Sequence, residues 1–260
     1  MGLILAALSL LQTLGVTIPP PSIDVQAMAR DTVRLETKLF DEIPQHCFTM
    51  RIFQEEPTDD PKRKKETRLE HVCFRGEVPV YQRLEINGKP TGLKITDPFP
   101  PPDDEWRKRA EKIHEARKTQ IDIMQQCLLA FNITYVNETV LDGRPTIVVD
   151  LKPNPNYHAQ SRTYELLKSI SGRAWIDKET HYLVHVQART FKDFALWGGL
   201  IVRVKEGASF EMRQKIFDGV WLPYYMESRW EGKLAMVKRL GDHYRLERFD
   251  FQRGTADKRP

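Results

Sequence analysis

Residues 208–240 read ASFEMRQKIFDGVWLPYYMESRWEGKLAMVKRL, and the pattern within this stretch decides the fold class. Apolar and polar residues alternate along it, as they do in β-strands that bury one face and expose the other. Turn residues at Asp218-Gly219 and near Gly232 divide the stretch, so it predicts three antiparallel strands. The apolar positions are Phe210, Met212, Ile216, Val220, Leu222, Tyr224, Met226, Trp230, Leu234, Met236 and Leu240.

The opposite face of these strands is polar and charged. It carries Glu211, Arg213, Lys215, Glu227, Arg229 and Arg239. A sheet that is apolar on one side only needs a cover for that side. Two interpretations of the covered space stay open. It is either an ordinary filled core or a curved sheet that leaves a cavity for an apolar ligand.

Alternation of the same kind extends over much of the chain. Residues 31–54 and 66–95 are predicted strands, and Asn87-Gly88 and Asp142-Gly143 are predicted two-residue hairpin turns. A further hairpin is expected across residues 178–180. Neighbouring strands joined by such short turns must run antiparallel, so we expect a mostly antiparallel sheet.

One long helix interrupts the strands. Residues 105–131 place apolar residues at intervals of three or four with charged residues between them, which is typical of an amphipathic helix. Residues 161–170 predict a short second helix, so the expected fold class is α+β, a sheet covered by one long and one short helix. The candidate cavity residues are Trp106, Ile113, Met124 and Leu128 from the helix and Phe210, Met212, Leu222, Tyr224, Met226, Trp230, Leu234 and Met236 from the strands.

The N-terminus is typical of a secretory signal peptide. Residues 3–16 form an apolar run that is too short for the ~20 residues spanning a bilayer but suits a signal peptide. Ala27-Met28-Ala29 has the small-x-small pattern that signal peptidase recognises. Cleavage nearer Val16, or a buried core helix, are the alternatives. The expected organisation is a signal peptide at residues 1–29, a single domain at residues 30–253 and a disordered tail at residues 254–260.

Two of the three cysteines are expected to face each other. Cys47 and Cys73 lie in strand-like runs on either side of a polar stretch. In a hairpin centred on Asp60, residues whose numbers sum to 120 are paired, and paired Cβ atoms lie ~4.5–5.5 Å apart. An oxidising compartment would favour a disulfide between them, and two buried free thiols are the alternative. Cys127 lies in the long helix and is expected in the core.

Sequence motifs for catalysis and for nucleic-acid binding are missing. The 40 basic and 36 acidic residues are interleaved, which argues against a nucleic-acid partner. No Gly-rich phosphate loop and no nucleophile elbow occur in the sequence. His181 and His185 lie in a strand-like run, where residues four apart are ~13 Å from each other and cannot share one metal ion. We therefore expect no catalysis, cofactor or metal site, and a hydrolase ranks third among the functions considered.

The segment from Phe191 to Ile201 is unusually apolar and has Gly198-Gly199 near its middle. An apolar run of this kind must either pack or meet a partner. It is either a core strand or a glycine-hinged loop at the cavity mouth that touches lipid or a membrane. The candidate contact residues are Phe191, Phe194, Leu196, Trp197 and Leu200.

Two further motifs carry a family resemblance. GRAWIDKETHYLVHVQAR at residues 172–189 and DGVWLP at residues 218–223 resemble the periplasmic outer-membrane lipoprotein-sorting proteins of the LolA/LolB-like superfamily. The resemblance implies an incomplete, strongly curved antiparallel β-barrel closed by helices, with an apolar cavity for acyl chains. It also implies a periplasmic, non-catalytic carrier of a lipid or lipidated protein, monomeric and in transient contact with membranes. A structural or interaction module of the cell envelope is the alternative.

Overall fold

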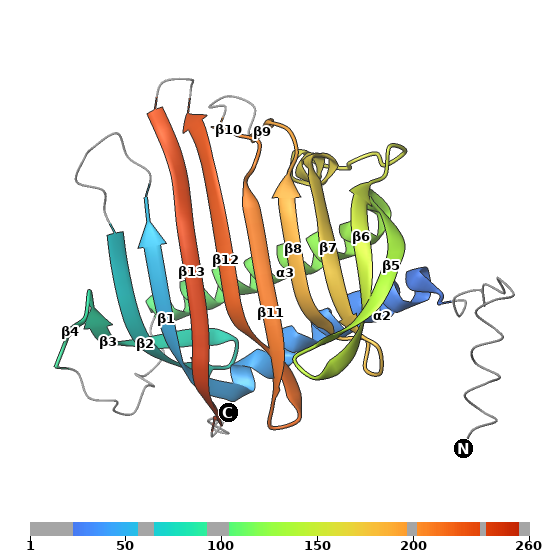
Figure 1. The fold of residues 1–260 in the computed structure, drawn as a ribbon. Coiled ribbons are helices and arrows are strands. Elements are labelled where there is room, and N and C mark those ends of the chain that lie inside the picture. The colour runs from blue at the N-terminus through green and yellow to red at the C-terminus, as the bar shows by residue number, and fades with distance from the viewer. Residues whose placement is uncertain (1–22, 57–64, 93–103, 197–201, 235–237, 255–260) are drawn as a thin grey trace, which may run out of the picture.

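The computed structural model describes residues 23–56, 65–92, 104–196, 202–234 and 238–254. These residues form one curved, open antiparallel sheet, and the helices lie on one side of it (Figure 1). The expected fold class, a mostly antiparallel sheet with helices, is therefore confirmed. None of the helices in this part of the chain has both the length and the apolar character needed to cross a membrane.

Thirteen strands make up the sheet in the described residues. They are β1 (His46–Glu55), β2 (Lys65–Arg75), β3 (Val78–Ile86), β4 (Lys89–Pro90), β5 (Phe131–Leu141), β6 (Arg144–Pro153), β7 (Ile170–Asp177), β8 (Leu183–Thr190), β9 (Phe194–Leu196), β10 (Val202–Val204), β11 (Ser209–Phe217), β12 (Val220–Leu234) and β13 (Lys238–Arg253). Their spatial order is β4-β3-β2-β1-β13-β12-β11-β8-β7-β6-β5, and β10 and β9 attach to β12. Pairing of β1 with β13 brings the first and the last strand of the described residues together in the interior of the sheet.

Two main helices and two short helical segments accompany the sheet. They are α2 (Val25–Glu42), α3 (Asp104–Ala130), α4 (Arg162–Glu165) and the 3₁₀ segments η1 (Ile43–Gln45) and η2 (Leu166–Ser169). The long helix predicted over residues 105–131 is α3, and the short helix predicted over residues 161–170 is α4 with η2. Both predictions are confirmed.

The predicted two-residue hairpin turns are present. Asn87, Asp142 and Asp218 have φ angles of 52°, 50° and 49°, and each precedes a glycine that also has positive φ. Turns of this kind match the twist of the strands that they join, which explains why Asn-Gly and Asp-Gly occur there. The hairpin across residues 178–180 joins β7 to β8 as expected.

The strand predicted over residues 31–54 is wrong in its first half. Those residues continue α2, whose N-terminus is capped by Asp24 accepting a hydrogen bond from Ala27 N at 2.8 Å. Met28, Thr32 and Leu39 are buried along one side of this helix. Four-residue spacing of this kind belongs to a helix that packs on a sheet, and it was hidden among the many charged residues of the segment.

α2 supplies the main helix-to-sheet packing. Met28 packs with Ile147, Val149, Ala174 and Ile176 of β6 and β7 in one buried cluster. Further along the helix, Leu39 packs with Val184 of β8 and Trp221 of β12. These contacts make residues from Asp24 onward part of the folded domain. The apolar run at residues 3–16 lies outside the described residues, and cleavage of a signal peptide stays a prediction.

Gly232 does not lie at a turn, contrary to the expectation. β12 runs through it to Leu234, and residues 238–240 begin β13 instead of ending a separate strand. A Cβ atom at Gly232 would lie 2.5 Å from the carbonyl oxygen of Arg203 in β10. Glycine is needed here because the backbones of two strands approach closely.

Candidate functional site

The candidate site is the side of the sheet that faces the helices, which we call the inner face. It is defined by the side chains that pack against α2, such as Val149, Ala174 and Val184. Cross-strand pairs share a face of a sheet, so the register extends the inner face across the molecule. Val186 pairs with Met212, and Met212 pairs with Met226, which places both methionines on the inner face.

A β-bulge corrects two of the predicted cavity residues. Arg213 pairs with Tyr225 and Gln214 pairs with Pro223, so Tyr224 is an extra residue in β12. An extra residue reverses the side on which all earlier residues of the strand lie. Leu222 pairs with Lys215, and Tyr224 lies under the Lys215 ammonium at 4.5 Å from the ring centroid. The register therefore places Leu222 and Tyr224 on the opposite side of the sheet from Met226, and Leu222 is only 1% exposed there.

α3 runs across the sheet on the side where the helices lie (Figure 1). Its main contacts are with α2, with β3 near one edge and with β5 at the other edge. Arg117 holds it in place through ion pairs with Asp41 of α2, at 2.6 Å, and with Glu77. The helix therefore spans the curved sheet and does not fill it.

The apolar stripe of α3 is consequently only half-buried. Ala130 is the one fully buried residue of the helix, and it packs with Phe131, Tyr157 and Leu167 in a cluster that half-buried Cys127 also contacts. Trp106, Ile113, Met124 and Leu128 are all of intermediate exposure. Apolar surface thus remains on the side of α3 that carries the predicted cavity residues.

An apolar pocket of about 280 Å³ lies at one end of the inner face. Phe210 and Trp230, both predicted cavity residues, line it together with Phe194 of the predicted contact segment. The other lining residues are Leu166, Ile170, Ala188, Arg189, Thr190, Val204, Ala208, Ser209 and Arg229. We call it the rim pocket, and its walls come from η2, β7, β8, β9, β10, β11 and β12.

The predicted contact segment forms a short arm beside this pocket. β9 and β10 pair with each other, and β10 also pairs with the end of β12 through Val202 and Leu234. Phe191 is 44% exposed just before the arm, and Phe194 turns into the rim pocket. Trp197, Leu200 and Met236 lie outside the described residues, as do the side chains of Leu196 and Leu234. Contact of this arm with lipid stays a prediction.

Arg248 is a site residue that the sequence pattern concealed. It pairs with Met50 in the sheet, and its guanidinium carbon lies 5.2 Å from the ring centroid of inner-face Phe48. Desolvation lowers the pKa of Arg248 to about 10, although nearby Tyr244 and Tyr81 act in the opposite direction. The signal was available, because Tyr244, Leu246 and Arg248 alternate in one strand and only the last is charged.

Asp177 and Thr180, within the motif at residues 172–189, form the turn between β7 and β8. Asp177 is fully buried and accepts hydrogen bonds from the Thr180 backbone and hydroxyl, each at 2.8 Å, and from Arg144. Burial alone would raise the pKa of Asp177, but these bonds outweigh it and lower the value to about 2. The motif therefore shapes the hairpin between β7 and β8.

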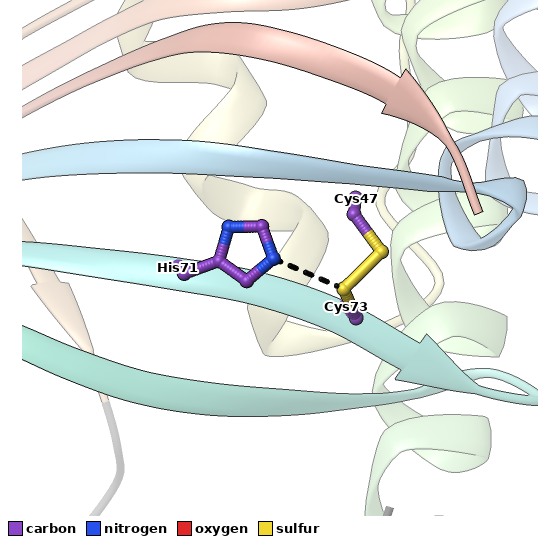
Figure 2. Close-up of side chains that lie close together, drawn as sticks. All are labelled: Cys47, His71 and Cys73. Carbon is purple, nitrogen blue, oxygen red and sulfur yellow. Dashed lines mark hydrogen bonds between the residues drawn. A yellow bond between two sulfur atoms is a disulfide. The ribbon is translucent and has the colours of Figure 1, made fainter. Parts of the chain in front are cut away.

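The cysteine pair lies on the outer face, and its register is the one predicted. Phe48 pairs with Val72 and Thr49 with His71, so residue numbers sum to 120. Cys47 and Cys73 are joined in a disulfide with Cα atoms 4.3 Å apart, and His71 Nε2 lies 3.4 Å from Cys73 Sγ (Figure 2). These three side chains could offer metal ligands only after reduction, because a disulfide leaves no thiolate.

His181 and His185 have separate partners, but the strand expected for both holds only His185, because His181 lies in the turn before β8 with a φ of 61°. His181 Nδ1 lies 3.2 Å from an Asp31 carboxylate oxygen, whereas His185 stacks on Trp175 and lies 3.0 Å from Glu211. A polar groove of about 730 Å³ runs beside this second group on the outer face. Its charged walls are largely paired within the protein, for example Arg173 with Asp150 at 2.7 Å.

Comparison with known proteins adds a likeness of shape. No family model and no curated protein matches the chain. Solved structures similar to it include a DUF1329 family protein from Desulfovibrio piger, with 10% identity, coverage of 89% of this chain and 93% of that one, and a TM-score of 0.33. Another is a putative outer membrane lipoprotein-sorting protein domain from Vibrio parahaemolyticus, with 11% identity, coverage of 87% and 94%, and a TM-score of 0.34.

A third is a LolA superfamily protein from Nitrosomonas europaea, with 11% identity, coverage of 92% and 96%, and a TM-score of 0.30. The second and third structures bear names of the superfamily that residues 172–189 and 218–223 resemble. Scores of this size say nothing about ligand or activity. Those must follow from the residues of this chain.

Proposed function

We propose that this protein is a non-catalytic carrier that binds the acyl chain of a lipid or lipidated protein on its inner face. The observation that carries the proposal is the rim pocket, with its walls of Phe194, Phe210, Trp230 and neighbouring apolar side chains. Burial of an acyl chain there gains about 0.8 kcal/mol for each methylene removed from water. The half-buried stripe of α3 extends the apolar surface available to such a chain.

Export to the periplasm is part of this proposal. The apolar run at residues 3–16 and the Cys47–Cys73 disulfide both support an exported protein. Cleavage would have to fall before Ile23, because Met28 and Ala29 are only 4% and 5% exposed in the folded domain. Removal of Met28 would open a gap beneath β6 and β7.

Filling the rim pocket tests the proposal. Ala208 lines the pocket, whereas Ala195 is exposed on the neighbouring strand β9. Binding of cis-parinaric acid to delipidated protein, followed by its fluorescence, should weaken at least tenfold in Ala208→Phe and stay within twofold in Ala195→Phe. Thermal unfolding of both variants controls for loss of structure.

Two results would contradict the carrier function. One is that wild-type protein does not bind the acyl probe, which would favour an interaction module with a filled core. The other is equal binding by both variants, which would remove the rim pocket from the site. Native mass spectrometry of protein purified from its own host should also detect bound lipid.

A further inference from the structure

Arg248 is a half-buried cation of the inner face that has no acidic partner among the described residues. Met50 of β1 lies between Arg248 of β13 and Glu70 of β2, and it pairs with both of them. Glu70 is 4% exposed and forms an ion pair with Arg83 at 3.2 Å. The one buried carboxylate near this row is therefore already neutralised by a different arginine.

The guanidinium of Arg248 has one edge in use and one edge free. Its Nη1 donates a hydrogen bond to the carbonyl oxygen of Pro223 at 3.1 Å. Its Nε is buried and has no partner within the part of the chain that the structure describes. The Nε and Nη2 hydrogens of a guanidinium point the same way, and this edge binds the two oxygens of a carboxylate or phosphate.

Apolar and aromatic side chains surround this free edge. Phe48 lies beneath the guanidinium, and the cluster around it contains Met50, Val72 and Leu246, with Met226 packed against it. A charged group held in such surroundings without a counter-ion destabilises the fold. An anion that arrives with an apolar chain would both neutralise the charge and cover the cluster.

Strand β12, which lies beside Arg248, connects the surroundings of this arginine with the rim pocket. Pro223, which accepts the Arg248 hydrogen bond, and Trp230, which lines the pocket, lie on one strand, β12. Seven residues of strand span roughly 23 Å. Met226 lies between them on the inner face. Met226 and the small side chain of Ser228 therefore lie between the cation and the pocket on this face of β12.

We propose that Arg248 binds the anionic oxygen group of an amphiphile, a carboxylate or a phosphate, whose acyl chain extends along the inner face. The proposal rests on the carrier function given above and names the class of ligand: an acyl chain with an acid at its end. Arg248 recognises the acid through its free Nε–Nη2 edge, while the apolar cluster and the rim pocket take the chain.

Ligands that have the same acyl chain but different head groups separate the contribution of the acid from that of the chain. Binding of oleate, oleoyl lysophosphatidic acid, methyl oleate and inorganic phosphate to delipidated wild-type protein is measured by displacement of a neutral fluorescent probe, Nile red. At least one of the two acids should bind ten or more times tighter than methyl oleate, and inorganic phosphate should not displace the probe. Preference between oleate and the lysophosphatidic acid tells whether the acid is a carboxylate or a phosphate.

The variant Arg248→Met removes the charge while keeping the length of the side chain. It should lose at least tenfold in affinity for the preferred acid and stay within threefold for methyl oleate. Arg245→Met is the matched control, since Arg245 is exposed on the same strand and should leave both affinities unchanged. Arg248→Lys keeps a charge without the two-pronged edge and should fall between wild type and Arg248→Met.

The outcomes distinguish this proposal from the carrier function itself. Equal binding of acid and ester by wild-type protein overturns the role of Arg248 and leaves the carrier function standing. Binding of neither overturns both. The wild-type comparison of acid with ester needs no variant, so it decides the question even where Arg248→Met does not fold.

Discussion

Replacing Glu36 with glutamine should remove a pH-dependent loss of stability from this protein. Glu36 lies in α2, and its carboxylate accepts hydrogen bonds from Gln214 Nε2 at 2.6 Å and from Leu183 N at 3.2 Å. Desolvation nevertheless raises the pKa of Glu36 to about 7, and the two hydrogen bonds only partly oppose it. The charged form is therefore less favourable in the folded protein than in the unfolded chain.

The sign and size of the effect follow from this difference. An acid whose pKa is raised by folding binds more protons in the native state, so stability falls as the pH rises. The loss begins near the unfolded value of 4.5 and is complete above about 7. At about 1.4 kcal/mol for each pH unit between the two pKa values, the loss between pH 5 and pH 8 is roughly 2.5 kcal/mol.

Glutamine suits the site because Gln214 Oε1 is buried without a hydrogen-bond partner in the described structure. A rotated Gln214 amide could accept a hydrogen bond from the NH2 of the new amide group, while the single oxygen of that group still accepts from Leu183 N. Glu36→Gln should therefore match wild type within about 1 kcal/mol at pH 5 and exceed it by roughly 3 kcal/mol at pH 8.

Urea unfolding of both proteins from pH 5 to pH 8 measures this difference. Glu111→Gln, at an exposed position of α3, controls for the change in net charge and should follow wild type at every pH. A difference between Glu36→Gln and wild type that stays constant within ~0.5 kcal/mol over this range would refute the reasoning.

Two further predictions concern the bonds and packing that hold the sheet and helices together. The Cys47→Ser/Cys73→Ser protein should lose about 3 kcal/mol of unfolding free energy, since a disulfide closing this 26-residue separation restricts the unfolded chain. Free thiols at these positions in non-reducing peptide maps of exported protein would contradict that expectation. Met28→Ala should cost about 2–5 kcal/mol in the buried α2 cluster, whereas half-buried Leu128→Ala should cost less than about 2 kcal/mol. Equal losses of unfolding free energy in the two variants, measured by denaturant unfolding, would show that α3 contributes as much packing energy as α2.

Much of the sheet was predictable because its signals are local. The turns at Asn87, Asp142 and Asp218 need only a residue pair that tolerates positive φ. The register of β1 with β2 followed from the position of one polar turn, and it placed Cys47 opposite Cys73 as observed. The long helix was also predictable, since its three- and four-residue spacing extends over 27 residues.

The composition of the candidate site was only partly predictable. Phe210 and Trp230 do line the rim pocket, but one bulged residue, Tyr224, moved Leu222 to the other side of the sheet. Bulges depend on how neighbouring strands twist together, which alternation within one strand does not record. Arg248 was missed for a related reason, because its lack of a partner becomes apparent only when its neighbours across the sheet are known.

The sequence by itself determined the element types, the tight turns and the alternation of apolar and polar faces, because each arises from residues close together in the chain. Only the tertiary structure decided that residues 31–42 are a helix and that α3 spans the curved sheet without filling it. It also decided which strands lie side by side, above all β1 with β13. These outcomes depend on burial against distant residues, and burial is a property of the folded chain, not of any single segment.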